Sequence, residues 1–303
     1  MGDETVWVRL AVPYADAVRA RIDHLRLNVT EEPLSDRPGR RVLITFRGMH
    51  DEPLDAYDWV HIAGAGADHV LSSLPSDGKV PLLTRTVGKM GQQIGEYVLS
   101  YILSDLQLHT ERRKLQAQSE WNVERLEGRF LFNTDVAILG VGGVAQGIAS
   151  MLAPLARRVI GYGRSARHVD PFTEVRALKD FKGADIIVGA FPRTPATDRL
   201  IGSQVFDACR DALVINIGRG ATLDDEALLR ALDNGNLRHA VLDVFREEPL
   251  PKTEPFWAHP RVTVTPHVSG ITLAEDTADA FLRHLPAFMD GTLQSTVFPD
   301  RGY

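Results

Sequence analysis

A glycine-rich turn in the middle of the chain precedes three polar residues whose types suit redox chemistry on a small acid. The turn is Gly140-Val-Gly-Gly-Val-Ala145, and the polar residues are Arg219, Glu248 and His267. An arginine fork binds a carboxylate, and a histidine exchanges protons near neutral pH. A nicotinamide site, an anion clamp and a proton donor together describe the reversible reduction of a 2-keto acid.

The glycine turn stands in the sequence context of a dinucleotide site. It directly follows the apolar run Val136–Leu139 and opens a stretch with helical spacing, Val144–Leu152. Such a site needs a tight turn, a close approach of backbone to the pyrophosphate, and a small residue for helix packing, here Ala145. Free N–H groups at the start of the helix favour the anion. The residues expected to hold the pyrophosphate are Gly140, Gly142, Gly143 and Val144.

The end of the next predicted strand bears on the choice between NADP and NAD. It reads Gly161-Tyr-Gly-Arg-Ser-Ala-Arg167, with no carboxylate and two arginines. NAD sites place an acidic residue there for the ribose 2′-hydroxyl, whereas guanidinium groups bind a 2′-phosphate. We predict a preference for NADP(H), with NAD(H) possible. The predicted contacts at this strand end are Gly163, Arg164, Ser165 and Arg167.

The three polar residues each lie at the carboxyl end of a predicted strand. Because open parallel sheets bind ligands at that edge, we expect the side chains to meet, although each alone has an ordinary alternative as a surface charge or a loop histidine. We interpret Arg219 as the cation for the substrate's carboxylate and carbonyl, and His267 as the acid/base. Glu248 is interpreted as the partner of the imidazole. Glu247 is the alternative candidate for this role, but we favour Glu248 because it directly precedes a rigid Pro-Leu-Pro turn.

The bulk composition narrows the class of protein. A chain of 303 residues with 44% hydrophobic and 24% charged residues is typical of a globular protein with two domains. The net charge of −6 argues against nucleic acid as a partner. Cys209 is the only cysteine, so we expect no intrachain disulfide and no metal site. We also expect no membrane span and a cytoplasmic location, because no apolar run is long enough and the N-terminus lacks a signal peptide.

The apolar runs predict an α/β protein with two domains, each a parallel sheet flanked by helices. We place the substrate-binding domain at residues 1–98 and 273–303 and the Rossmann dinucleotide-binding domain at 99–272. The predicted strands of the first are Val6–Val12, Val42–Phe46, Trp59–Ala63 and Leu82–Thr84. Those of the second are Val136–Leu139, Arg158–Tyr162, Asp185–Val188, Ala212–Asn216, Ala240–Asp243 and Val262–Thr265. Helices are expected over Gln92–Leu108, where Tyr97 belongs to a buried stripe, and over Thr272–Met289.

A charged segment, Thr110 to Arg125, follows the first of these helices and contains Trp121. Two interpretations stay open for it. It is either a solvated connector or an arm that reaches a partner subunit.

These motifs resemble the D-isomer-specific 2-hydroxyacid dehydrogenases. The most specific matches are Val214-Ile-Asn-Ile-Gly-Arg-Gly220, Leu242-Asp-Val-Phe245, Glu248-Pro-Leu-Pro251 and Thr265-Pro-His267. The resemblance implies a flavodoxin-like fold for the substrate domain and a homodimer formed through the cofactor domain. It implies that Arg219 binds substrate, that Glu248 pairs with the acid/base His267, and that Asp243 contacts the nicotinamide carboxamide.

The same resemblance implies further contacts. A loop of Pro192, Arg193 and Thr194 would lie against the cofactor, together with Ile217 and Gly218. Backbone N–H groups of Ala65 and Gly66, in Ala63-Gly-Ala-Gly66, would hold the substrate's carboxylate. Within the family, the Arg164-Ser165 pair, Met90 and the terminal Arg301-Gly-Tyr303 look most like the glyoxylate/hydroxypyruvate reductases. Two departures are Ala145 in place of the last glycine and the missing acidic residue, which puts NAD in doubt.

Two other functions remain open. A formate- or phosphite-type dehydrogenase would use the same fold, but the formate enzymes of this family carry glutamine where Glu248 stands. A corepressor-like relative would bind the cofactor without turning over glyoxylate, hydroxypyruvate or phenylpyruvate. The residues do not fix which 2-keto acid is used, and the candidates for setting this preference are Arg47, Arg85, Trp121 and Trp257.

Overall fold

The computed structural model describes residues 5–122 and 127–299, and its chain divides into two compact units. Unit 1 joins Met1–Lys89 to Thr272–Tyr303, and unit 2 is Met90–Ile271. Each unit is a parallel sheet with helices on both faces. The boundary that we placed at 98/99 falls inside helix α3 (Met90–Leu106), which is part of unit 2.

Unit 1 has a five-stranded sheet in the order β2-β1-β3-β4-β5, which is the order of flavodoxin-like folds. Its strands are β1 Val6–Ala11, β2 Asn28–Thr30, β3 Arg40–Thr45, β4 Trp59–Ile62 and β5 Leu82–Arg85. Its helices are α1 Ala15–Ile22, the 3₁₀ turn η1 Leu54–Ala56, α2 Asp68–Leu71 and α8 Ala274–Met289. Strand β2 was not predicted, because its three residues are polar or half-buried and lie at an edge of the sheet.

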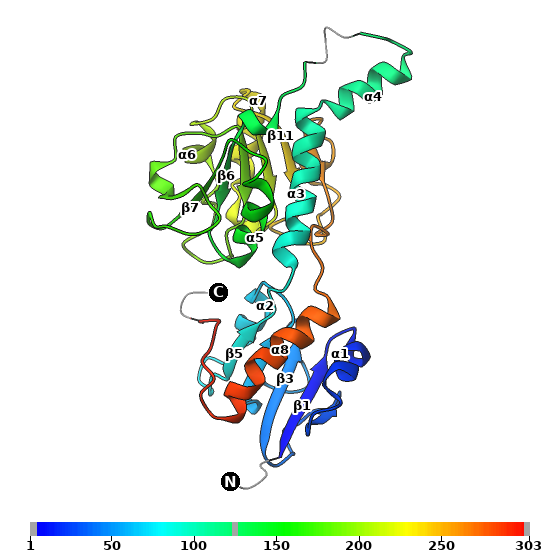
Figure 1. The fold of residues 1–303 in the computed structure, drawn as a ribbon, viewed down its shortest axis with the longest axis vertical. Helices are drawn as coiled ribbons and strands as arrows, with labels where there is room; N and C mark the ends of the chain where they lie inside the picture. The colour runs from blue at the N-terminus through cyan, green and yellow to red at the C-terminus, as the bar shows by residue number, and fades with distance from the viewer. Residues whose placement is uncertain (1–4, 123–126, 300–303) are drawn as a thin grey trace. The chain divides into compact units, whose positions relative to one another are not determined.

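The two faces of this sheet have separate apolar layers. On one face α1 and α8, from opposite ends of the chain, lie side by side, and Val18 and Phe281 are buried with Val8 of β1 (Figure 1). On the other face η1 and α2 contribute Leu54 and Val70 to a second cluster. The return of α8 to the first strands makes this unit discontinuous in sequence.

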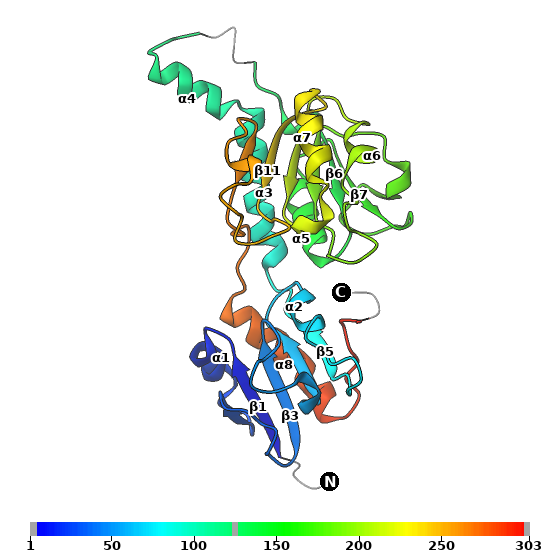
Figure 2. The same cartoon turned by 180° about the vertical axis from the view of Figure 1, so that it is seen from behind.

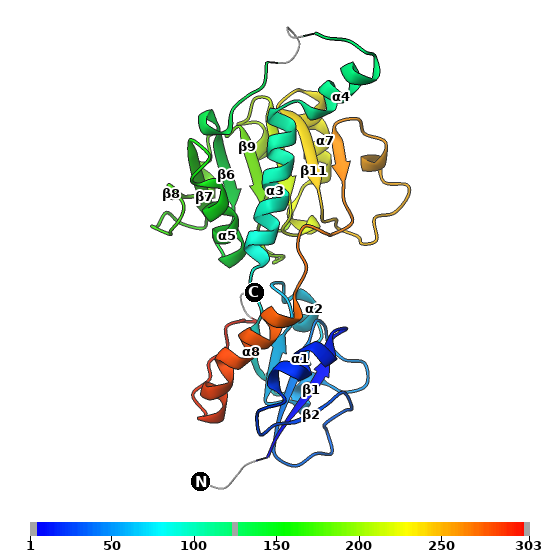
Figure 3. The same cartoon turned by 45° about the vertical axis from the view of Figure 1, so that its right-hand side comes forward.

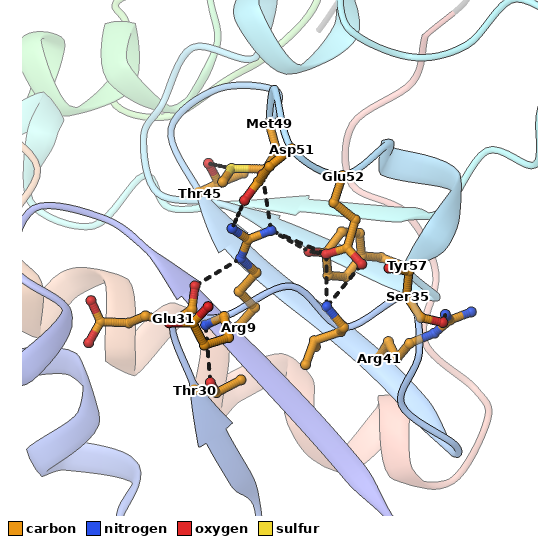
Figure 4. Close-up of polar contacts among 12 residues, drawn as sticks. Arg9, Thr30, Glu31, Ser35, Arg41, Thr45, Met49, Asp51, Glu52 and Tyr57 are labelled. Atoms are coloured by element: carbon orange, nitrogen blue, oxygen red, sulfur yellow. Dashed lines mark hydrogen bonds and ion pairs between the residues drawn. The ribbon is translucent and has the colours of Figure 1, made fainter.

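A buried ionic cluster fixes the loop after β3 to the sheet (Figure 4). Arg9 of β1 is only 4% exposed, and its guanidinium lies 2.6 Å from Asp51 Oδ2 and 3.2 Å from Glu52 Oε2. Glu52 also accepts hydrogen bonds from the Tyr57 hydroxyl and, at 2.9 Å, from the backbone N–H of Leu34. The hydrogen bond from Arg9 holds the pKa of Asp51 below its usual range. A buried charge needs such partners, so the cluster holds the 51–57 segment on β1.

Unit 2 has a seven-stranded parallel sheet in the order β12-β11-β10-β9-β6-β7-β8. Its strands are β6 Asp135–Leu139, β7 Arg158–Gly163, β8 Glu174–Ala177, β9 Ile186–Gly189, β10 Ala212–Asn216, β11 Leu237–Leu242 and β12 Val262–Val264. From β6 the chain winds outward through β7 and β8, and then returns to β9 on the other side of β6. This reversal between β6 and β9 is where doubly wound sheets bind dinucleotides.

Helices cover both faces of the unit 2 sheet. The helices that cover it are α3 Met90–Leu106, α5 Gly143–Leu152, α6 Ser203–Phe206 and α7 Asp225–Asp233, and the unit also contains α4 His109–Ala117. The 3₁₀ turns are η2 Leu131–Asn133, η3 Leu178–Asp180, η4 Gly220–Thr222 and η5 Pro255–Trp257. Helices α3 and α5 lie over one face (Figure 3), and α6 and α7 over the other (Figure 2). Helices α3 and α5 cross closely because a Cβ at Gly147 would lie 2.6 Å from the Cα of Gly91.

Helix α4 extends away from the sheet of unit 2 (Figure 1), and Trp121 beyond it is 95% exposed. Residues 123–125 of the predicted arm, like the terminal Arg301-Gly-Tyr303, lie outside the described residues. Among the helices of the described ranges, none has the length and apolar character needed to cross a bilayer. Within the same ranges, no group of three or more His, Cys, Asp or Glu side chains is placed to hold a metal ion.

Candidate active site

One edge of the unit 2 sheet collects the residues that the sequence singled out. The order of the strands places His267 after β12, Glu248 after β11 and Arg219 after β10. Next along the edge come Pro192 after β9 and the glycine turn after β6. Because parallel strands end at the same edge, the acid/base candidates and the dinucleotide turn occupy one continuous rim.

His267 and Glu248 form a hydrogen-bonded pair. The imidazole Nδ1 lies 2.7 Å from Glu248 Oε2, and Glu248 Oε1 accepts the backbone N–H of Phe245 at 2.8 Å. The His267 and Glu248 side chains are 48% and 35% exposed, so a ligand can reach them. Engaging Nδ1 leaves Nε2 as the ring nitrogen that can exchange a proton with a ligand. The carboxylate in contact with the imidazole is that of Glu248 and not of its neighbour Glu247.

The turn that carries Arg219 packs directly on the loop that carries Glu248. A Cβ on Gly220 would lie 1.8 Å from the carbonyl carbon of Phe245, so only glycine permits this approach. The turn is closed by the Thr222 hydroxyl, which donates to the Arg219 carbonyl at 2.7 Å. The half-buried Arg219 side chain donates from Nη1 to the carbonyl of Gly218 at 2.8 Å. The backbone of Arg219 is therefore held in contact with the loop that carries the partner of the imidazole.

Asp243 is completely buried between β11 and the His267 turn. Its Oδ1 accepts the hydroxyl of Thr265 at 2.6 Å and the N–H of Val268 at 2.9 Å, and its Oδ2 accepts the N–H of Ser269 at 2.9 Å. The Tyr97 hydroxyl lies 2.6 Å from that of Thr265. The sequence singled out Asp243 only through the family resemblance and Tyr97 only as part of a buried stripe. No side-chain pattern indicates where backbone N–H groups point, so this network was missed.

The glycine turn after β6 fits a dinucleotide. Gly140 has a φ of +129°, and a Cβ there would lie 2.8 Å from the Ala190 carbonyl oxygen. Gly142 immediately precedes α5, and a Cβ built on it would meet no protein atom within 4 Å. The open space beside Gly142, at the start of the helix that begins Gly143-Val144, is where a pyrophosphate would approach the backbone. Ala145 is 1% exposed and belongs to the core under the helix.

Arg164, Ser165 and Arg167 are exposed at the end of β7, after the half-buried Gly163. The backbone N–H of Arg167 donates to the Val175 carbonyl at 3.3 Å, which joins this loop to β8. Strand β7 is next to β6 in the sheet, so the loop flanks the glycine turn. This is the position of the adenosine end of a dinucleotide in such folds.

The loop of Pro192, Arg193 and Thr194 follows β9, and the Thr197 hydroxyl closes it by donating to the Pro192 carbonyl at 2.6 Å. Thr194 is 7% exposed and Arg193 is exposed. The neighbouring turn after β10 begins with the buried Ile217, and a Cβ on Gly218 would lie 2.7 Å from the Phe191 carbonyl oxygen. Both segments therefore lie between the glycine turn and Arg219.

Ala65 and Gly66 belong to unit 1, where they follow β4 and precede α2. Gly66 is exposed, and the Ala65 carbonyl accepts a hydrogen bond from Arg85 Nη1 at 3.0 Å. Arg85 ends β5, the neighbour of β4. The loop thus lies at the carboxyl edge of its own sheet. Trp257, another candidate, is 53% exposed and donates from Nε1 to the Pro251 carbonyl at 2.9 Å.

Comparison with known proteins identifies the family of the chain. Residues 99–269 match the family model "D-isomer specific 2-hydroxyacid dehydrogenase, NAD binding domain". The chain is 34% identical over 274 residues to a glyoxylate/hydroxypyruvate reductase A of Serratia proteamaculans (strain 568), with 86% of each chain covered. A second reductase of that name, from Yersinia enterocolitica, is 32% identical over 77% of each chain.

Solved structures resemble the chain over almost its whole length. A D-isomer specific 2-hydroxyacid dehydrogenase from Xanthobacter autotrophicus Py2, in complex with NADPH and MES, matches with a TM-score of 0.83, 26% identity and 99% coverage of both chains. An NADPH-dependent glyoxylate/hydroxypyruvate reductase from Sinorhizobium meliloti, in complex with NADP and sulfate, matches with a TM-score of 0.76 and 27% identity, covering 99% of this chain and 100% of that one. With its dinucleotide turn and its histidine–glutamate pair on one sheet edge, the chain belongs to the D-isomer specific 2-hydroxyacid dehydrogenase family of NAD(P)-dependent enzymes.

Proposed function

We propose that this enzyme uses NADP(H) to reduce a small 2-keto acid, of the glyoxylate or hydroxypyruvate class, to the D-2-hydroxy acid. The observation that carries the proposal is the 2.7 Å contact of His267 with Glu248, on the rim that also holds Arg219 and the glycine turn. The relatives named above as glyoxylate/hydroxypyruvate reductases support the choice of substrate class.

Each residue of the trio has a separate task. His267 protonates the carbonyl oxygen from Nε2, while Glu248 holds Nδ1 and stabilises the charged imidazole. Arg219 binds the carboxylate and polarises the carbonyl, which stabilises the negative charge that develops on that oxygen. The bound nicotinamide supplies the hydride.

The cofactor preference rests on the loop after β7. No carboxylate occurs between Gly163 and Arg167, whereas Arg164 and Arg167 are exposed cations. Two similar solved structures contain NADPH or NADP, which supports the same choice. We assign Arg164 and Ser165 as contacts of the 2′-phosphate and Arg167 as support.

A panel of 2-keto acids assayed with NADPH and with NADH tests the proposal. The wild type should reduce glyoxylate or hydroxypyruvate with a higher kcat/KM for NADPH, and Arg164→Ala should lower kcat/KM for NADPH by about tenfold while leaving that for NADH unchanged. Equal use of both cofactors in the wild type and in Arg164→Ala would refute the NADP(H) preference. NADPH binding without turnover of any 2-keto acid would favour a corepressor-like role.

We further propose that the enzyme is a homodimer formed through unit 2. Its exposed aromatic residues include Trp121, Phe130 and Phe132, and the last two stack with ring centroids 5.3 Å apart. Large exposed apolar side chains close together are typical of an interface. Sedimentation equilibrium should give twice the mass of the 33.5 kDa chain, and a monomer would refute this proposal.

A further inference from the structure

The backbone of His267 has a conformation that needs support from its surroundings. Its φ is +53°, in the left-handed region that L-residues other than glycine rarely adopt. Such a conformation persists only where neighbouring groups fix it, and it is often found at catalytic positions. The residues that fix this turn therefore determine where the imidazole is held.

Three consecutive N–H groups of the turn bind one residue, Asp243. The N–H of His267 donates to the Asp243 carbonyl at 2.9 Å, and the N–H groups of Val268 and Ser269 donate to Oδ1 and Oδ2, each at 2.9 Å. The Asp243 side chain is 0% exposed, so these bonds are shielded from water. The orientation of the Asp243 carboxylate thus sets the course of the turn.

Two hydroxyl groups continue this network into helix α3. A carboxylate only accepts hydrogen bonds, so Thr265 must donate its proton to Asp243 Oδ1, at 2.6 Å. The oxygen of Thr265 then accepts the hydroxyl proton of Tyr97, which lies 2.6 Å away. The direction of the whole chain is therefore fixed, from Tyr97 through Thr265 to Asp243. Only one residue, Pro266, separates Thr265 from His267 in sequence.

We propose that Tyr97 and Thr265 are positioning residues for the reaction, which hold the Asp243 carboxylate in the orientation that fixes the turn of His267. This inference rests on the proposed function. It assigns to Tyr97 and Thr265 an effect on the chemical step and not on the binding of the cofactor. A small displacement of a catalytic group lowers the rate far more than it lowers stability.

Thr265→Val removes both hydroxyl bonds and keeps the shape of the side chain. We expect kcat with glyoxylate and NADPH to fall about 10²-fold, with the NADPH Kd unchanged. Thr265→Ser restores the hydroxyl and should restore kcat. Tyr97→Phe removes one bond and should lower kcat by about fivefold to tenfold. Ser100→Ala is the matched control on the same helix, since its exposed hydroxyl donates at 2.7 Å to the backbone carbonyl of Tyr97 and not to the network, and it should keep the wild-type kcat.

Hydrogen exchange at the amides of Val268 and Ser269 gives a readout that does not require turnover. Thr265→Val should accelerate exchange at both amides, and Thr265→Ser should not. Unchanged exchange in Thr265→Val, an unchanged kcat, or a Thr265→Ser enzyme as slow as Thr265→Val would each overturn the inference. Wild-type enzyme that reduces no 2-keto acid would instead overturn the proposed function, and the exchange result would still decide whether Thr265 holds the turn.

Discussion

The two carboxylate oxygens of Glu248 have different partners. Oε2 lies 2.7 Å from Nδ1 of His267, and Oε1 accepts the backbone N–H of Phe245, in the same loop as Glu248, at 2.8 Å. Because one oxygen is tied to the N–H of Phe245, the other is presented to Nδ1 in a fixed direction. A carboxylate in this position stabilises the charged imidazole, which an amide does not do. The same residue therefore fixes the orientation of the ring and places a carboxylate beside it.

We expect Glu248→Gln to lower kcat for glyoxylate by about 10²-fold, because the amide keeps the shape but loses the charge. Glu247→Gln is the matched control, one residue away, and should keep wild-type kcat. Steady-state kinetics with NADPH measures both variants. A Glu247→Gln enzyme that is the more impaired would contradict the assignment.

At the level of single residues, the sequence supports the prediction of side chains at strand ends but not of backbone contacts. The pairing of His267 with Glu248 followed from residue type and from the rule that strand ends meet. The contacts of Asp243 depend on the directions of the N–H groups of Val268 and Ser269, which residue types do not encode. The Arg9 cluster was missed for a similar reason, since Arg9 and Asp51 are 42 positions apart and neither has a motif.

The loops after β10 and β11 act as a single element because Gly220 has no side chain. Its backbone rests on Phe245, whose N–H in turn binds Glu248. Arg246 adds a second connection, since its Nη2 donates to the Ala221 carbonyl at 3.0 Å. Arg219, the proposed cation for the substrate, and Glu248, the partner of the imidazole, are thus positioned by one packed pair of loops.

Gly220→Ala should separate these loops, because its Cβ would lie 1.8 Å from a backbone carbon. We expect kcat/KM for glyoxylate to fall by about 10²-fold and the free energy of unfolding to fall by about 1–3 kcal/mol. Ile187→Val, in the buried strand β9, should cost about 1 kcal/mol without an effect on kcat/KM, which makes it the stability control. Full activity in Gly220→Ala would show that the loops move independently.

At the level of elements, the long apolar runs were sufficient to predict the central strands. Ala212–Asn216 was predicted with the bounds that β10 has in the structure. The edge strands β2 and β8 were missed, because Asn28–Thr30 and Glu174–Ala177 are short and partly polar. An edge strand needs only one neighbour, so its sequence carries a weaker apolar signal.

The stability of the molecule as a whole should depend on pH through His61. This residue is 0% exposed in β4, with Nδ1 2.7 Å from the Thr84 hydroxyl and Nε2 3.0 Å from that of Thr86. Burial, reinforced by the nearby His284, lowers the pKa of His61 from 6.5 to about 3. The folded state therefore keeps this ring neutral under conditions in which the unfolded chain binds a proton.

The direction of this pH dependence follows from the number of protons that the folded and the unfolded states bind. Between pH 6.5 and about 3 the unfolded state binds more protons at His61, so the free energy of unfolding falls as the pH falls, by up to about 1.4 kcal/mol per pH unit. Urea unfolding at pH 6.5, 5.5 and 4.5 should show a shallower pH dependence in His61→Gln than in the wild type. Identical slopes would mean that His61 is not kept neutral by folding.

The order of the strands in unit 2 was not predicted from the sequence, although the Rossmann class was. The order depends on which side of β6 each strand after β8 occupies. Packing between residues that are distant in sequence determines this. The parallel direction of the strands brings the end of β12 to the same rim as the glycine turn, and the order sets which strand ends are neighbours along it.

At the centre of the proposed function, His267 is the acid/base of a 2-keto acid reductase. The most direct test is kcat for glyoxylate with NADPH in His267→Ala, with the NADPH Kd measured on the same protein. We expect kcat to fall by at least about 10³-fold while Kd stays unchanged. A His267→Ala enzyme with a kcat within tenfold of the wild type, in a folded protein that binds NADPH, would contradict it.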